Sequence, residues 1–238
     1  MKKHRFIGDF DFSQSKIISH DQKLIKQIKN VLCLSIHEQV ILSAGDGNET
    51  LAVIEDLNKD EILFKLLEKK TNLAEPTNFV TLYCSILKRE NFELVVQKAT
   101  ECGVKKIVPI VSSRTVKTGL KIERLEKIIK EASEQSGRGL VPKLGTIISL
   151  SEALLEAKTN KLNLFFDASG EKFTTEDKKG KTIGIFIGPE GGWTAEELTL
   201  ARENSCQIVG LGALILRGET AAIVASYLAV NTSQASPV

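Results

Sequence analysis

The sequence predicts an α/β protein in which a small, mostly β domain precedes a larger domain built on a parallel sheet. Three observations predict this arrangement. Short apolar runs fill the first 72 residues, strand-like and helix-like segments alternate after residue 78, and a polar seam at 71–78 (TNLAEPTN) separates the two patterns. The 238 residues are 42% hydrophobic and 26% charged, so a disordered or fibrous chain is excluded.

Four short apolar runs mark the first domain, residues 1–72. They are 31–36 (VLCLSI), 39–44 (QVILSA), 50–57 (TLAVIEDL) and 61–69 (EILFKLLEK). The turn signal GDGN at 45–48 lies between the second and third runs, where a hairpin requires it. We therefore expect a small β domain, folded as a barrel.

Strand-like and helix-like segments alternate along residues 73–238. The predicted strands are 78–87, 105–112, 162–168, 182–188 and 207–212. The predicted helices are 90–102, 121–136, 150–157, 194–203 and 221–230. The fourth helix begins with Thr194 and has Glu197 three residues later, the pattern of a capping box. Such alternation predicts a parallel sheet with helices on both faces.

Cysteine and apolar patterns limit the class of protein. The four cysteines are far apart and form no CxxC pair, which disfavours a disulfide framework and a zinc ribbon. The first residues lack the apolar region of a signal peptide. The most apolar stretch, 208–230, carries Arg217 and Glu219 near its middle, so it reads as a buried strand and helix and not as a membrane span. We expect a soluble cytoplasmic protein.

Histidine placement narrows the chemistry. The only histidines, His4, His20 and His37, lie in the first sixth of the chain. The larger domain therefore has no histidine for a Ser-His-Asp triad, an HExxH zinc site or a general base. Its chemistry must use carboxylates, arginines, backbone amides or a cofactor.

Two glycine-bearing segments are candidates for a ligand site. Each follows a predicted strand and precedes a predicted helix: 187–193 (IGPEGGW) and 211–222 (LGALILRGETAA). Neither is GxGxxG or GxxxxGK[ST], so a dinucleotide fold or a P-loop is unsupported. The segments could be plain tight turns, and Arg217 and Glu219 could be a structural pair or the start of a helix. Two such loops at one sheet edge favour a shared ligand site.

Charge is unevenly distributed along the chain. The overall net charge is +2, but residues 79–143 hold 13 Lys and Arg against 7 Asp and Glu, a net +6. Residues 1–78 carry a net −1 and residues 144–238 a net −3. The central segment thus contains a candidate surface for a polyanion, although scattered lysines are also typical of an ordinary solvated face.

Several motifs together resemble one known family. IGPEGGW (187–193) and LGALILRGETA (211–221) are similar to the C-terminal signature of the RsmE-type 16S rRNA (uracil-N3)-methyltransferases of the SPOUT superfamily. Segments 95–116 and 124–142 resemble that family's QKATELGV and EAxEQSxR regions. HRFIG (4–8) and GDGN resemble its PUA-like RNA-binding barrel, in which Cys33 stands where the family usually carries Arg.

The resemblance implies a PUA-like barrel at 1–72 that binds RNA and a SPOUT methyltransferase domain at 73–238 with a trefoil knot, working as a homodimer. It implies S-adenosylmethionine as cofactor, with no metal. The cofactor-binding residues it implies are Phe166, Gly188, Glu190, Gly191, Gly192, Leu211, Gly212, Leu216 and Thr220. The RNA-binding residues it implies are Arg5, Arg114, Lys117 and Arg138, and the catalytic candidates are Arg217 and Glu219.

The expected function is methylation of N3 of a uridine in 16S rRNA or the small ribosomal subunit. Arg217 would stabilise negative charge on the uracil oxygens. The proton acceptor stays open between Glu219, water and a uracil pKa lowered by Arg217. The alternatives are a non-catalytic RNA-binding or ribosome-assembly factor that keeps the fold, and a nucleotide-using α/β enzyme of another kind.

Overall fold

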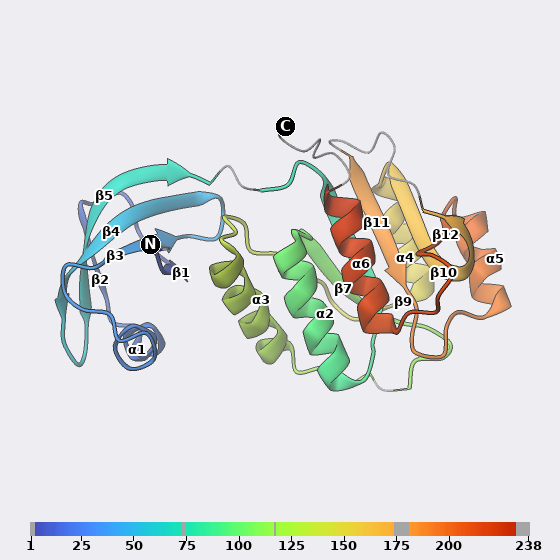
Figure 1. Ribbon diagram of the computed structural model, residues 1–238, viewed down its shortest axis with the longest axis horizontal. Helices are drawn as coiled ribbons and strands as arrows, with labels where there is room; N and C mark the ends of the chain where they lie inside the picture. Colours follow the sequence, from blue (N-terminus) through green and yellow to red (C-terminus); the bar gives the residue numbers. More distant parts are fainter. Residues whose placement is uncertain (1–2, 73–74, 117, 174–180, 232–238) are drawn as a thin grey trace. The chain divides into compact units, whose positions relative to one another are not determined.

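The computed structural model describes residues 3–72, 75–116, 118–173 and 181–231, and the chain divides into two compact units (Figure 1). Unit 1 comprises Met1–Glu75 together with Ser133–Val141. Unit 2 comprises Pro76–Ala132 and Pro142–Val238. The assignment of Ser133–Val141 to unit 1 differs from the predicted division, in which this segment belongs to the second domain.

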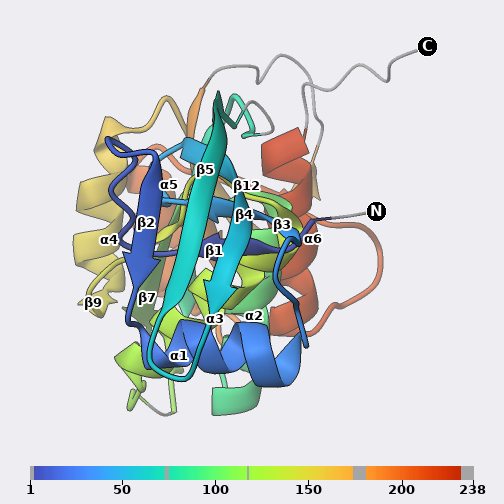
Figure 2. The ribbon, with the colours of Figure 1, turned by 90° about the vertical axis from the view of Figure 1, so that its left-hand side faces the viewer.

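Unit 1 is built on a five-stranded sheet (Figure 2). Its elements are β1 (Arg5–Ile7), β2 (Lys16–Ser19), α1 (Gln22–Lys26), the π-helix η1 (Gln27–Val31), β3 (Gln39–Ser43), β4 (Asn48–Leu57) and β5 (Ile62–Thr71). The strand order is β1-β3-β4-β5-β2, with β1 and β3 parallel and the other pairs antiparallel. No pairing joins β1 to β2 within the described residues, so the sheet forms half of a barrel.

The hairpin predicted around GDGN is confirmed. Strands β3 and β4 pair in antiparallel register, and the Asp46 carboxylate accepts a hydrogen bond from the backbone N–H of Asn48 at 2.9 Å. Three of the four apolar runs form strands. The run 31–36 does not, because it starts at the end of η1 and continues as a loop in which Cys33 adopts a φ of 51°.

The core of unit 1 is formed by the sheet and by the apolar side of α1 and η1. Leu24, Ile25 and Ile28 of these helices are buried in one cluster with the inward residues of the strands. The Asp21 side chain caps α1 by accepting a hydrogen bond from the backbone N–H of Lys23 at 2.8 Å. The sequence pattern missed α1 because five residues are too short for a clear helical period.

Unit 2 contains the predicted alternation of strands and helices. Its elements are β6 (Phe79–Ser85), α2 (Arg89–Cys102), β7 (Lys106–Val111), α3 (Ile122–Ser136), β8 (Lys143–Leu144), β9 (Ile148–Ser149), α4 (Leu150–Glu156), the 3-10 helix η2 (Ala157–Thr159), β10 (Leu162–Lys172), β11 (Thr182–Ile187), α5 (Ala195–Glu203), β12 (Gln207–Gly210) and α6 (Gly218–Asn231). The end of α3 belongs to the segment grouped with unit 1.

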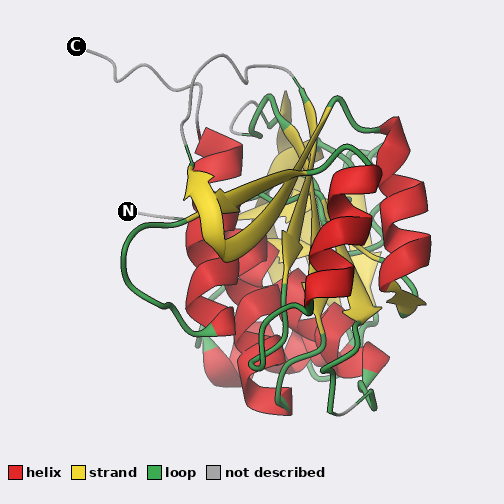
Figure 3. Cartoon of the chain, turned by 90° about the vertical axis from the view of Figure 1, so that its right-hand side faces the viewer, coloured by secondary structure: helices red, strands yellow, loops and turns green. Residues whose placement is uncertain are grey.

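All strand pairs of unit 2 are parallel. The order is β12-β10-β11-β6-β7-β8, and β9 also pairs with β7. Helices lie on either side of this sheet (Figure 3). The predicted α/β class is therefore confirmed, and the capping box of Thr194 and Glu197 is present at the start of α5.

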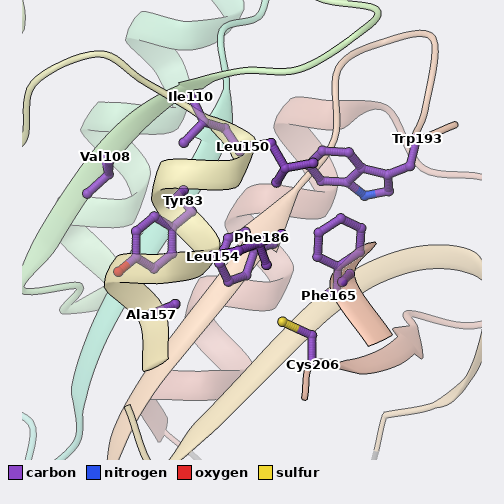
Figure 4. Packing of buried hydrophobic residues seen from close by; sticks show 12 residues of the cluster. Tyr83, Val108, Ile110, Leu150, Leu154, Ala157, Phe165, Phe186, Trp193 and Cys206 are labelled. Carbon is purple, nitrogen blue, oxygen red and sulfur yellow. The ribbon is translucent and has the colours of Figure 1, made fainter. Parts of the chain in front are cut away.

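An aromatic row forms the core between the sheet and helices α4 and α5 (Figure 4). The ring of Phe186 on β11 stacks on Tyr83 of β6 at 4.5 Å between centroids and on Phe165 of β10 at 5.5 Å. Trp193, in the loop after β11, continues the row at 4.3 Å from Phe165. The core thus extends from the sheet directly to the loop that the sequence marks as a ligand-binding segment.

Strand β10 is longer than its predicted range of 162–168. Its pairing with β12 is regular up to Phe166, shifts register, and resumes at Glu171 and Lys172. The strand order does not test the trefoil knot, which stays a prediction. Within the part of the chain that the structure describes, no helix has the length and apolar character needed to cross a membrane.

Candidate functional site

Three neighbouring strands of unit 2 are in register at the level where β11 ends. Phe166 of β10 lies in register with Ile187 of β11 on one side and with Val209 of β12 on the other. Because these strands are parallel, the segments that follow them emerge at one edge. Ligands of open α/β sheets bind at this carboxyl edge.

A cavity of about 680 Å³ lies at this edge, within the size range of small-molecule sites. It brings together almost all the cofactor-binding and catalytic residues predicted in unit 2. The predicted residues that line it are Phe166, Gly188, Glu190, Gly191, Gly192, Leu211, Gly212, Leu216, Arg217 and Glu219. Thr220 does not line the cavity and is exposed in the first turn of α6.

Backbone geometry explains two of the glycines. Gly192 and Gly212 have φ values of +68° and +132°, a region that side chains with a Cβ rarely adopt. Each lies in one of the two loops that border the cavity. The two motifs therefore require glycine for the path of the loop itself.

Trp193 fixes the loop after β11 against the sheet. Its indole N–H donates a buried hydrogen bond of 3.0 Å to the carbonyl oxygen of Phe166, the last residue of β10 before its register shift. The indole also packs against Gly188, where an added Cβ would lie 3.0 Å from the ring. Trp193 lines the cavity, although the sequence marked it only as part of a motif.

Arg114 and Glu197 tie the loop after β7 to the same loop. The Nη1 of Arg114 donates to the carbonyl oxygens of Gly191 at 2.6 Å and of Trp193 at 3.3 Å. The buried Glu197 carboxylate accepts hydrogen bonds from the backbone N–H of Ser113 at 2.8 Å and of Thr194 at 2.8 Å. Arg114, predicted to bind RNA, thus also has a structural contact with the cavity wall.

The irregular part of β10 forms another wall. Asp167 and Ala168 line the cavity, and Gly170 packs against the backbone of Val209. An added Cβ on Gly170 would lie 2.5 Å from the Val209 nitrogen, so only glycine permits this approach. The sequence shows Gly170 without showing this contact, because the register shift depends on the pairing with β12.

The start of α6 places both catalytic candidates at the cavity. Arg217 is exposed, and Glu219 lies in the first turn of the helix. The Oε2 of Glu219 is buried and has no hydrogen-bond partner among the described residues. Buried carboxylate oxygens without a donor are costly, so this atom is an acceptor available to a ligand.

Two further cavity residues come from the start of α2. Lys88 and Asn91 line the cavity, and the Glu190 carboxylate accepts a hydrogen bond from the backbone N–H of Lys88 at 2.9 Å. The sequence analysis missed both residues. The signal that could have found them is their position directly after β6, the strand next to β11 in the sheet.

Two arginines predicted to bind RNA are paired inside unit 1. Arg138 forms an ion pair with Glu75, with Nη2 and Oε2 2.9 Å apart and the Arg138 side chain 5% exposed. Arg5 forms an ion pair with Glu49, and both side chains are largely buried. An RNA contact by either arginine would require its ion pair to open. Lys117, the fourth predicted RNA contact, lies outside the described residues.

The described residues provide neither a metal site nor a reactive thiol. Among the described residues, no group of three His, Cys, Asp or Glu side chains could hold a metal ion. Burial raises the pKa of the Cys84 thiol well above its usual value, and the Glu190 carboxylate raises it further. Cys84 therefore stays protonated and is not a thiolate nucleophile.

Comparisons with known proteins agree with this geometry. A family model described as an RNA methyltransferase domain matches residues 74–230. Ribosomal RNA small subunit methyltransferase E of Rickettsia conorii is 32% identical over 94% of this chain and 94% of its own. The Neisseria gonorrhoeae enzyme of the same name, solved with S-adenosyl methionine bound, superposes with a TM-score of 0.86 at 31% identity, over 94% of this chain and 95% of that one. A methyltransferase from Legionella pneumophila, solved with the same cofactor, gives a TM-score of 0.86 at 26% identity, over 96% and 97% of the two chains.

Replacing Arg114 with Ala should loosen the loop that carries Trp193, because two hydrogen bonds to loop carbonyls are lost. Trp193 is the only tryptophan of the chain, so its fluorescence reports on this loop. We expect acrylamide to quench the variant more strongly than the wild type. The control is Arg124→Ala, which removes a cation of the same central segment that pairs with Glu93. Equal quenching in both variants would contradict the structural role of Arg114.

Replacing Arg138 with Ala should destabilise unit 1. The change leaves the Glu75 carboxylate without its charged partner, and breaking a buried pair in this way costs about 3–5 kcal/mol in the free energy of unfolding. Urea denaturation measures this value. Arg124→Ala serves again as the control, because its ion pair is at the surface and should matter little. If the Arg138→Ala protein is as stable as the wild type but binds RNA poorly, the result would support the prediction that Arg138 contacts RNA.

Proposed function

Because this chain belongs to the RNA methyltransferase family that includes ribosomal RNA small subunit methyltransferase E, we propose that it methylates N3 of a uridine in 16S ribosomal RNA with S-adenosylmethionine as methyl donor. The observation that carries the proposal is the cavity at the carboxyl edge of the sheet. Two glycine-bearing loops meet there, and Arg217 and Glu219 both line the cavity. The proposed substrate is the 16S rRNA or the small subunit, and the location proposed with it is the cytoplasm.

The residues of the cavity fit S-adenosylmethionine. The cavity has room for a molecule of that size, and its wall is mostly loop backbone and apolar side chains, including Phe166, Leu211 and Leu216. The unpartnered Oε2 of Glu219 is an acceptor that a ligand donor would satisfy. We therefore assign the adenine side to the loops at 188–192 and 211–216.

When bound, S-adenosylmethionine supplies a methyl group whose carbon leaves sulfur without the bonding electron pair and bonds to the lone pair of the acceptor nitrogen. The N3 of uracil has this lone pair only after it loses its proton. Arg217 would hold the negative charge that then develops on the uracil oxygens. Glu219 would receive the N3 proton through Oε2, with water as the other acceptor.

Positioning accounts for much of the expected rate. A methyl transfer requires the acceptor nitrogen in line with the breaking bond, and holding two reactants in that geometry removes a large entropic cost. The hydrogen bonds of Trp193, Arg114 and Glu197 fix the loops that would do this. The chain thus supplies orientation through its loops and charge through its side chains.

A non-catalytic ribosome-assembly factor is the second candidate. A protein without catalytic activity would not need a cofactor cavity. Because both glycine-bearing loops line the cavity, we favour the enzyme. Calorimetric titration with S-adenosylmethionine separates the two, because a lapsed enzyme should bind it poorly. A nucleotide-using enzyme of another kind is disfavoured because the sequence lacks GxGxxG and a P-loop.

RNA binding is proposed for unit 1. With Arg5 and Arg138 paired internally, we assign phosphate contacts to exposed lysines, such as Lys23 and Lys26 on α1. Exposed cations of this kind attract the RNA backbone without reading its sequence. Selection of one uridine then falls to the cavity of unit 2.

The protein is proposed to act as a homodimer. Leu214 and Ile215, in the loop before α6, are 83% and 90% exposed, and Tyr227 on α6 is 58% exposed. A second copy of the chain would cover such apolar side chains, which otherwise face water at a cost. The interface would then border the cofactor cavity, since Leu214 and Ile215 also line it.

Replacing Arg217 with Ala should lower methyl transfer to small ribosomal subunits by about 100-fold at saturating cofactor, because one stabilising donor is lost from the transition state. Transfer of a labelled methyl group measures the rate. The binding constant for S-adenosylmethionine serves as the control and should change little. Near-normal turnover would remove Arg217 from the mechanism.

Replacing Ile215 with Asp should yield monomers, because a charge cannot be buried cheaply in an apolar interface. Sedimentation velocity of the wild type should give the mass of two chains. The matched control is Leu155→Asp, since Leu155 on α4 is also exposed and apolar but does not line the cavity. A monomeric wild type would contradict the proposed dimer.

A further inference from the structure

Lys88 reaches the cavity from a fourth strand of the sheet. The predicted cofactor-binding residues lie within β10 or in the loops after β11 and β12, whereas Lys88 and Asn91 lie where the chain passes from β6 into α2. The strand order puts β6 beside β11 and farthest from β12 among these four strands. The cavity therefore extends beyond the cofactor loops to the β6 side, where Lys88 and Asn91 form part of its lining.

Lys88 and Arg217 lie on the same part of the rim. Gly218 packs so closely on Leu87 that an added Cβ would lie 3.1 Å from the Leu87 Cδ2. Lys88 follows Leu87 directly, and Arg217 directly precedes Gly218. The contact between Leu87 and Gly218 therefore brings the backbones of Lys88 and Arg217 close together, and both residues line the cavity.

The charges of these two cations are not balanced by an ion pair within the described residues. Neither Lys88 nor Arg217 forms an ion pair with any residue in the described part of the chain, whereas the adjacent Arg89 pairs with Glu93 at 3.2 Å. The charged residues lining the cavity are Lys88, Asp167, Glu190, Arg217 and Glu219. Asp167 accepts from Ser169 and Glu190 from the backbone of Lys88. None of the three acids, Glu219 included, forms an ion pair with either cation within the described residues.

We propose that Lys88 is a second catalytic cation, which holds negative charge on one uracil oxygen while Arg217 holds it on the other. The inference rests on the proposed function and extends it to the target base. Loss of the N3 proton leaves a charge shared between the two oxygens that flank N3. Two cations that converge on one rim match an anion of this shape, and each lowers the pKa of N3 by favouring the charged form. Asn91, beside Lys88, adds an uncharged amide donor to the same side of the site.

The test compares Lys88→Met with Arg89→Met, using the full-length protein and small ribosomal subunits as substrate. The two residues are adjacent cations at the start of α2, but only Lys88 lines the cavity. Methyl transfer is measured from pH 6 to pH 10, a range of about four units that brackets the titration expected for N3. Affinity for S-adenosylmethionine is measured by calorimetry on each variant.

We expect Lys88→Met to lower kcat about 10-fold or more near neutral pH and to move the rise of the rate upward by about one pH unit, with cofactor affinity unchanged. Arg89→Met should match the wild type in both measurements. Lys88→Arg keeps the positive charge and should restore the position of the pH profile.

Four other results overturn the proposal. Normal kcat and pH profile in Lys88→Met would mean that Lys88 does not face the base. A raised KM with an unshifted pH profile would assign Lys88 to an RNA phosphate. Lost cofactor binding would show a structural role instead. A wild-type protein that binds the cofactor but methylates no small-subunit RNA would refute the proposed function itself, and the role of Lys88 would fall with it.

Discussion

The hydrogen bond from the Trp193 indole to the Phe166 carbonyl is the contact on which the site depends. It joins the loop after β11 to the middle of β10, although Trp193 and Phe166 lie 27 residues apart in the chain. Because the bond is buried, losing it would leave two polar groups unpaired in the core. An added Cβ at Gly188 would lie 3.0 Å from the ring, so a side chain there would require the indole to shift. The aromatic core of unit 2 therefore continues directly into the cavity wall.

The two sides of the cavity differ in how their residues are held: the loop after β11 is fixed by hydrogen bonds, whereas the start of α6 presents charged side chains. Trp193, Arg114 and Glu197 hold the loop after β11 through hydrogen bonds to backbone groups. The start of α6 instead presents Arg217 and the unpartnered Oε2 of Glu219. Glu219 lies in the first turn of α6, where the positive end of the helix dipole is. The loop after β11 is thus held by hydrogen bonds to its backbone, and the groups proposed to act on the substrate are side chains at the start of α6.

Local patterns predicted the elements well and the contacts between them poorly. The capping box of Thr194 and Glu197 and the two glycine-bearing loops are readable because their signals lie within a few residues. Lys88 was missed because its place at the cavity follows from the strand order, which a single sequence does not contain. Gly170 was missed for the same reason, since its contact with Val209 depends on a register shift.

Charge was the pattern most altered by folding. The net +6 of residues 79–143 suggested a surface for RNA, yet several of its cations already have partners within the protein. Arg138 pairs with Glu75, Arg124 with Glu93, and Arg114 holds loop carbonyls. A cation that already has a fixed partner gains little from a phosphate, because the first pair must open. Among the described residues, the cations that line the cavity are Lys88 and Arg217, and because neither forms an ion pair they are the positive charges left available to a ligand there.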